Sequence, residues 1–264
     1  MKRRTFATLP VIGLAAGMLP TAAMPQVIDV NDAINKAGRQ RMLSQRAAKS
    51  YMAMGQKIQG EHADKILSAS MGLFDRQLAE LKAFAPTPEI KNTYAALEML
   101  WSDYKVALVG SAAVKGGADP VLNLAGKVLQ TANQGTVQLE AFSGKASSKL
   151  VNIAGRQRML SQRMATYYLS ASWGVQAAVS ATELAKARDE FAKAHELLKN
   201  APESTPAIKT ELLLAETQFS FFDLALRNLK PGSGDVTAQT NVFTTSERIL
   251  QVMDGVTGLY SRLG

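Results

Sequence analysis

The stretch Asn35 to Arg46, N-K-A-G-R-Q-R-M-L-S-Q-R, occurs twice in this sequence. It returns from Asn152 to Arg163 as N-I-A-G-R-Q-R-M-L-S-Q-R, so that only Lys36 against Ile153 differs between the copies. Each copy contains three arginines and no carboxylate. Because one copy lies near the start of each half, the sequence predicts two units of the same kind.

Outside the duplicated stretch, long runs rich in Ala, Leu, Gln, Lys and Met recur with helical spacing, and alternating strand patterns are scarce. The sequence therefore predicts an all-α fold of two tandem four-helix up-down bundles, residues 24–143 and 144–264. The expected helices span residues 28–58, 62–84, 88–113 and 119–142 in the first unit, and 146–174, 179–200, 205–229 and 236–262 in the second.

Capping residues set several of these boundaries. Thr87 and Thr205 each precede a proline at the first helical position, where the missing N–H is not needed. Asp119, followed by Pro120, is expected to cap the fourth helix in the same way, and Asp235 the eighth. Apolar stripes at helical spacing predict the core, and His195, which takes a stripe position, is expected to be a packing residue.

Two arrangements of the bundles are open. A short link through Ser143, Gly144 and Ser147 could place the fifth helix beside the first and parallel to it, which makes a pseudo-dimer with both motif copies in contact. Alternatively, the fourth and fifth helices run on through Gly144, which stacks the bundles end to end and separates the copies. A monomeric pseudo-dimer and a homodimer are both compatible with the sequence.

Composition excludes several classes of function. The 264 residues carry 47% hydrophobic and 20% charged residues, as an ordinary globular protein does, and there is no cysteine. We expect no metal, no cofactor and no enzymatic activity, since no nucleophile–base pair or ligand cluster stands out. The net charge of +8 is too mild to argue for nucleic acid.

The first residues predict export. Lys2, Arg3 and Arg4 precede an apolar run and the small residues up to Ala23, which is typical of a signal peptide over residues 1–23, of the general secretory or the twin-arginine kind. Its removal takes away three positive charges and no acid, leaving +5. The mature chain is expected in the periplasm.

Within the motif, the two copies keep polar residues as well as apolar ones, which packing alone does not require. On a helix, Gly38 and Arg41 fall on one side together with Ser44 and Gln45. A glycine there lets a neighbouring backbone approach closely, and an arginine that cannot lose its charge then needs a carboxylate or an anionic ligand. Arg39 and Arg46 are expected to lie on a solvated face or to form bridges to acids of neighbouring helices, such as Asp64 or Asp75.

The motif is similar to the first-helix signature of PilJ/NarX-like sensor domains of type IV pilus chemoreceptors and nitrate-sensing kinases. This resemblance implies a four-helix bundle that dimerises and, in the nitrate-binding members, an anion held between the two first helices by a glycine and an arginine from each. The corresponding residues here are Gly38, Arg41, Gly155 and Arg158. Their supporting neighbours would be Ser44, Gln45, Ser161 and Gln162.

Leu43 and Gln45 match the pilus-receptor version of the motif, and no kinase or methyl-accepting coiled coil is recognisable. The sequence therefore favours a non-enzymatic exported binding protein for a small oxyanion, nitrate or nitrite first, which acts with a membrane-bound sensor or transporter. The alternative is a structural or interaction module of the cell envelope that binds no ligand.

Overall fold

The computed structural model describes residues 26–263, and the expected signal peptide lies outside them. This part of the chain folds into eight α-helices and one short 3₁₀ turn, with no β-strand. The all-α prediction is therefore confirmed, and each predicted helix lies within four residues of an observed one at either end. The first four helices are α1 (Val30–Gly55), α2 (Gly60–Phe84), α3 (Pro88–Val109) and α4 (Ala118–Ser143), and the last four are α5 (Ala146–Ser172), α6 (Ala177–Asn200), α7 (Pro206–Arg227) and α8 (Val236–Ser261).

Three of the predicted caps hold. The hydroxyls of Thr87 and Thr205 accept hydrogen bonds from the backbone N–H of the third residue of α3 and α7, and the carboxylate of Asp235 does the same for α8. Each cap satisfies one of the N–H groups that a helix leaves unpaired at its start.

Asp119 does not cap α4, which corrects the sequence-based expectation. The 3₁₀ turn Lys115–Gly117 runs directly into α4, so the helix already begins at Ala118, with Gly117 at the cap position and no side-chain cap. Asp119 lies inside the first turn, and its carboxylate accepts a hydrogen bond of 2.8 Å from Gln176 instead.

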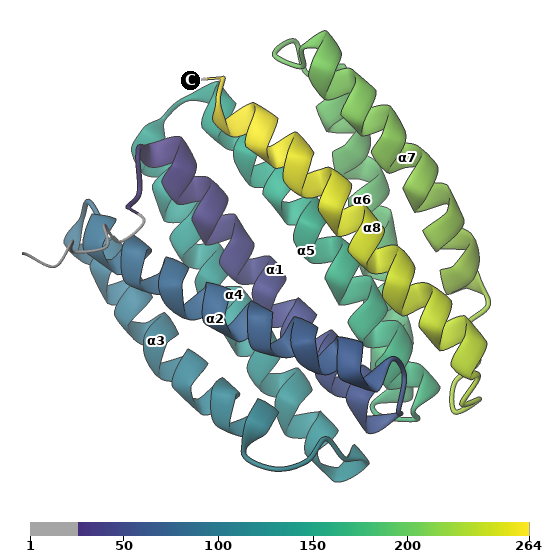
Figure 1. Cartoon of the computed structure of the whole chain (residues 1–264). Helices are drawn as coiled ribbons and strands as arrows, with labels where there is room; N and C mark the ends of the chain where they lie inside the picture. Colours follow the sequence, from purple (N-terminus) through teal and green to yellow (C-terminus); the bar gives the residue numbers. More distant parts are fainter. Residues whose placement is uncertain (1–25, 264) are drawn as a thin grey trace, which may run out of the picture.

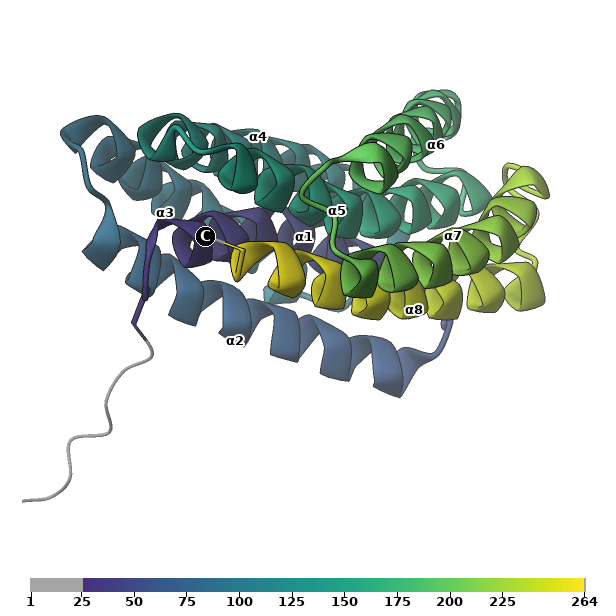
Figure 2. The same ribbon diagram turned by 90° about the horizontal axis from the view of Figure 1, so that it is seen from above.

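The two four-helix units lie side by side, with α1 and α5 in the middle (Figures 1 and 2). α1 packs on α2 and α4, α5 packs on α6 and α8, and the contact between α1 and α5 joins the units. The two helices run parallel: Ser148 donates to Asn31 near their starts, and Thr166 donates to the carbonyl of Gln45 further along. Stacking end to end is thereby excluded.

Gly144 makes this arrangement possible. It joins α4 to α5 with a φ of 64°, a left-handed conformation that glycine adopts at little cost. The chain therefore turns back on itself, and α5 starts beside the start of α1. We propose this turn as the boundary between the domains 24–143 and 144–264.

α1 and α5 are buried on nearly all sides, which is unusual for helices so rich in polar residues. The predicted stripes form the core around them; in α3, for example, Trp101 stacks on Phe74 at 3.8 Å between ring centroids and donates to Asp75. His195 is a packing residue, as predicted: it is buried and stacks on Phe191.

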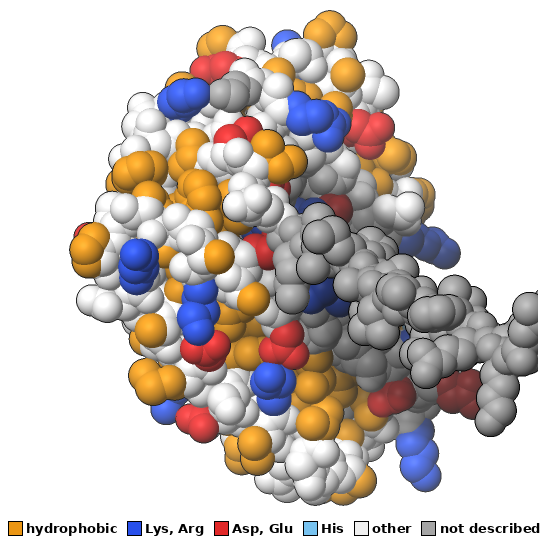
Figure 3. Space-filling model, turned by 60° about the vertical axis from the view of Figure 1, so that its left-hand side comes forward, with side chains coloured by type: hydrophobic (Ala, Val, Ile, Leu, Met, Phe, Trp, Pro, Cys, Tyr) orange, Lys and Arg blue, Asp and Glu red, His pale blue; other side chains and the backbone are white. Residues whose placement is uncertain are grey.

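The face over α2 and α3 carries hydrophobic, basic and acidic side chains side by side (Figure 3). The exposed hydrophobic residues of α3 are Met99, Val106 and Val109. Among the described residues, no helix combines the length and the apolar character needed to cross a bilayer.

Candidate functional site

The two motif copies meet where α1 packs on α5. Gly38 and Gly155 face each other, and a Cβ atom added to Gly38 would lie 3.3 Å from Nη2 of Arg41 and 3.4 Å from Nη2 of Arg158. A Cβ atom on Gly155 would meet the same two nitrogens at 3.5 and 3.2 Å. All four predicted ligand-binding residues are therefore brought together in one place, and both arginines are fully buried.

The arginines cross over between the helices. Nη2 of Arg41 on α1 donates to the backbone carbonyl of Asn152 on α5, at 3.2 Å. Nη2 of Arg158 on α5 donates to the carbonyl of Asn35 on α1, at 3.0 Å. These carbonyls lie three residues before Gly155 and Gly38. Because glycine has no side chain, each guanidinium group has room to reach the carbonyl on the other helix.

The other terminal nitrogen of each arginine has a partner in the fourth helix of its own unit. Nη1 of Arg41 donates to Oδ1 of Asn133 in α4 at 2.8 Å, and Nη1 of Arg158 donates to Oδ1 of Asp254 in α8. One guanidinium is thus paired with a carboxylate, and the other only with a neutral amide. Among the described residues, Arg41 forms no ion pair.

Both arginines also retain a buried donor without a hydrogen-bond partner, the Nε–H group. On a guanidinium group, Nε and Nη2 form the edge that recognises a planar oxyanion through two parallel hydrogen bonds. Since Nη2 of each arginine lies beside both glycines, the half-used edges of two cations converge on the same gap.

The electrostatics reflect the difference in partners. Burial lowers the pKa of Arg41, and the positive charges of Arg156 and Arg158 lower it further, to about 9. Burial and Arg39 lower the pKa of Arg158 to about 10, against the opposing effect of Asp254. Both groups stay charged at neutral pH, so the gap holds two buried cations.

The family model described as the N-terminal domain of type IV pili methyl-accepting chemotaxis transducers, PilJ, matches residues 26–131 and 141–221. These segments cover more than half of the chain, and each contains one motif copy. The chain belongs to the PilJ family. PilJ is a sensory, non-enzymatic domain family, typically periplasmic. The accompanying searches of curated proteins and of solved structures found no match.

The predicted supporting residues of this PilJ protein act on the helices rather than on the guanidinium groups. Ser44 donates to the carbonyl of Arg41, and Gln45 donates to Ser44 and to the carbonyl of Ala125 in α4. Ser161 and Gln162 repeat this pattern with Arg158 and Ser246. Gln45 and Gln162 thus fix each motif helix against the fourth helix of its unit, and Ser44 and Ser161 accept from these amides within the motif helix.

The remaining motif arginines form ion pairs, as expected, but with other acids than Asp64 and Asp75. Arg39 pairs with Asp254, Arg46 with Glu247, Arg156 with Glu190 and Arg163 with Glu183. Asp75 is engaged by Trp101 and Lys105. The expected candidates lie on the outer side of α2, whereas α8 packs against the side of α1 from which Arg39 and Arg46 extend.

Sequence reasoning missed the partners in the fourth helices. Asn133 and Asp254 contact the arginines, and Lys49, fully buried, pairs with Glu247 and donates to Ser246. The position of Asp254, directly after the buried Met253 of α8, is also usual for a surface acid, so the sequence carries no signal that singles it out.

A polar pocket borders the site on the α8 side. This pocket, of about 520 Å³ between α1 and α8, is lined by residues that include Asn35, Arg39 and Asp254. Asp254 belongs to both the pocket and the site, since its side chain is 43% exposed and contacts the buried Arg158. The carboxylate of Asp254 thus stands between this pocket and the buried Arg158.

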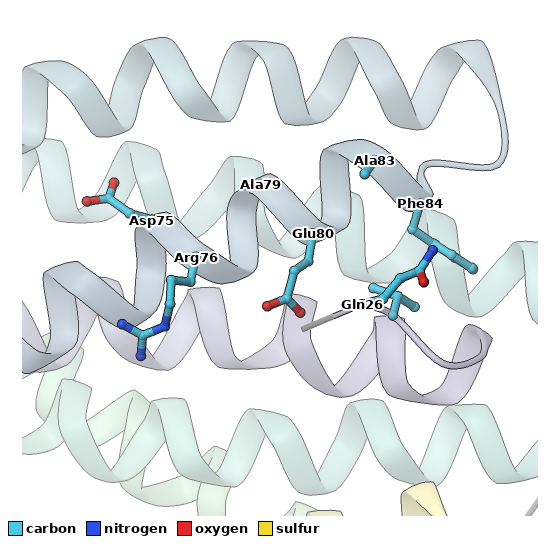
Figure 4. A pocket seen from close by; sticks show the side chains of 8 residues that line it. Gln26, Asp75, Arg76, Ala79, Glu80, Ala83 and Phe84 are labelled. Atoms are coloured by element: carbon cyan, nitrogen blue, oxygen red, sulfur yellow. The ribbon is translucent and has the colours of Figure 1, made fainter. Parts of the chain in front are cut away.

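A second groove, of about 690 Å³, lies along α2 and the segment before α1, and neither Arg41 nor Arg158 lines it. Figure 4 shows Arg76 and Glu80 extending from α2 beside it. The described residues include no group of three or more His, Asp or Glu side chains suited to a metal ion. The gap between the motif glycines remains the candidate site.

Proposed function

We propose that this PilJ protein is a non-enzymatic binding protein for a small oxyanion, with nitrate or nitrite as the first candidates. The ligand would lie between α1 and α5, held by Arg41 and Arg158 in the space left by Gly38 and Gly155. The observation that carries this proposal is the burial of two guanidinium groups beside the same pair of glycines, where, among the described residues, Arg158 has a carboxylate partner and Arg41 has none.

Binding would use the Nε–Nη2 edges of both arginines. The ligand would replace the carbonyls of Asn152 and Asn35 as acceptors for Nη2 and supply the acceptor that each Nε–H lacks. At an effective dielectric of about 20, an anion about 4 Å from each guanidinium gains about 4 kcal/mol per contact, more than the repulsion of about 3 kcal/mol between two cations about 6 Å apart. Desolvation reduces the surplus, which favours a weakly hydrated ion.

The signal peptide proposed for residues 1–23 would deliver the protein to the periplasm, and a membrane-bound sensor or transporter would receive the signal or the ligand. Since one chain supplies both motif helices, a monomer would suffice for one complete site. This makes the monomeric pseudo-dimer our proposal for the working form, with the homodimer as the alternative.

Thermal unfolding with and without nitrate tests the proposal. A ligand at about 100 times its Kd adds about 2.7 kcal/mol of stability, which raises the Tm of a domain of this size by about 5 to 10 °C. We expect such a shift in the wild-type protein and its loss in Arg41→Ala/Arg158→Ala. Arg163→Ala is the matched control, since Arg163 belongs to the same motif but pairs with Glu183.

The shift should persist in Arg163→Ala. The proposal is wrong if nitrate, nitrite and other small oxyanions all leave Tm unchanged, or if the double variant shows the same shift as the wild type. The change in Tm on adding nitrate is measured within each variant, so a variant with a lower Tm in the absence of nitrate can still be compared with the wild type.

A structural or interaction module is the second candidate. It is favoured by the contacts that both arginines already make, because the carbonyls of Asn35 and Asn152 tie α1 to α5 without any ligand. In that case the double variant would be less stable than the wild type, and no oxyanion would raise the Tm of the wild type.

A further inference from the structure

The two halves of the site differ in the residue that accepts from Nη1 of each buried arginine. Gln45 binds the carbonyl of Ala125 in α4, and Gln162 binds the carbonyl of Ser246 in α8, which aligns the two fourth helices. Eight residues further along each helix, Arg41 meets Asn133 and Arg158 meets Asp254. The pseudo-two-fold arrangement therefore places an amide on one side and a carboxylate on the other.

This difference determines the charge of the site. Arg41 and Arg158 bring two buried positive charges and Asp254 brings one negative charge, which leaves one positive charge without compensation. The flanking charges cancel: Arg156 and Arg39 add two positive charges, and Glu190 and Glu140, which both act on Arg41, add two negative ones. A single residue thus separates a site with one excess charge from a site with two.

We propose that Asp254 makes the site selective for monovalent oxyanions over divalent ones. This inference rests on the proposed function and adds the class of ligand that the site accepts. One excess positive charge matches a monoanion. A dianion such as sulfate would leave an uncompensated negative charge beside Asp254 in a buried place, where charge is costly.

The position of Asp254 strengthens this assignment. Its side chain borders the polar pocket between α1 and α8, and it contacts Arg158 directly. An anion that arrives from this pocket meets the carboxylate before it meets the fully buried guanidinium. Asp254 would therefore act on the approach of the ligand as well as on the bound state.

The pseudo-symmetry supplies matched variants for the test. Asp254→Asn gives both arginines an amide, Asn133→Asp gives both a carboxylate, and the double swap Asn133→Asp/Asp254→Asn moves the carboxylate to the other half. Calorimetric titration with nitrate as the monoanion and sulfate as the dianion, at constant ionic strength, gives the ratio of the two affinities for each protein.

We expect Asp254→Asn to raise the sulfate-to-nitrate affinity ratio at least about tenfold, and Asn133→Asp to weaken nitrate binding at least about tenfold. The double swap should return the ratio to within about threefold of the wild type, since the excess charge is again one. Because each ratio is taken within one protein, differences in stability between variants do not enter it.

Two results would overturn the inference and leave the proposed function standing. In the first, nitrate binds through Arg41 and Arg158 but Asp254→Asn keeps the wild-type ratio. In the second, the double swap keeps the ratio of Asp254→Asn, which would show that total charge is not the determinant. If neither anion binds any of the four proteins, the inference is wrong, and the proposed function is wrong as well when nitrite and the other small oxyanions also leave Tm unchanged.

Discussion

Gly38 and Gly155 lie so close across the α1–α5 contact that a Cβ atom on Gly38 would be 3.7 Å from the Cα atom of Gly155. This proximity allows Arg41 and Arg158 each to reach the backbone of the other helix. Close packing and the gathering of two cations therefore have the same origin, the absence of two side chains.

Gly38→Ala should abolish anion binding without unfolding the protein. The added methyl group would lie 3.3 Å from Nη2 of Arg41, so the guanidinium must shift and the ligand loses its space, whereas alanine favours the helix by about 0.5–1 kcal/mol. We expect wild-type helical content by circular dichroism and no nitrate-dependent rise in Tm.

Gly126→Ala is the control for this substitution, because Gly126 lies on an exposed position of α4 with open space around its Cα atom. It should keep the full nitrate response. A normal response in Gly38→Ala would contradict the assignment of the ligand to the gap between the glycines.

Arg41→Met and Arg158→Met should differ in stability when no oxyanion is present. Replacing a buried charge that lacks a counter-ion with an apolar side chain of similar volume is often neutral or stabilising, so Arg41→Met should leave the free energy of unfolding unchanged or raise it by up to about 2 kcal/mol. Arg158→Met removes a partner of Asp254 and should cost about 1 kcal/mol or more.

Urea denaturation in a chloride buffer measures both values. A larger loss in Arg41→Met than in Arg158→Met would mean that Asn133 and the carbonyl of Asn152 stabilise Arg41 as well as Asp254 stabilises Arg158. The unequal counter-ions would then have no energetic effect.

Glu247 should make stability fall in acid. Burial raises the pKa of Glu247, but the positive charges of Lys49 and Arg46 outweigh this and lower it to about 2. Between the ordinary pKa of about 4.3 for glutamate and this value, the unfolded state binds more protons, so stability present above the ordinary pKa is lost as pH falls, by at most about 1.4 kcal/mol per pH unit.

Glu247→Gln should lack this part of the acid sensitivity and should already be less stable at pH 7, by about 3–5 kcal/mol, because Lys49 is left buried without a carboxylate. Glu98→Gln is the control, since the Lys82–Glu98 pair is exposed and contributes about 1 kcal/mol at most. Urea denaturation across the acid range compares the three proteins, and equal curves for Glu247→Gln and the wild type would refute the assignment.

Much of the architecture could be read from the sequence, because local rules decide it. Proline after Thr87 and Thr205 marks helix starts whatever surrounds them, and the identical motif copies indicate two equivalent helices. Gly144 allowed either a turn or a continuous helix from the sequence alone, and only the packing of α5 on α1 decides between them.

The partners of the motif arginines could not be predicted, because they depend on how the fourth helix of each unit is placed against the first. The motif copies are 117 residues apart, whereas Asn133 and Asp254 are 121 residues apart. A single repeat offset therefore aligns Asn133 with Leu250 and conceals that Asp254 has an amide as its counterpart.

The parallel contact of α1 and α5 within one chain has a consequence for how such a site can evolve. In a dimer of identical chains, every substitution occurs twice, so the formal charge of a site on the two-fold axis changes only in steps of two. Joining both halves in one polypeptide removes this parity constraint. Asn133 and Asp254 are the result, a one-unit adjustment that no symmetric dimer could make.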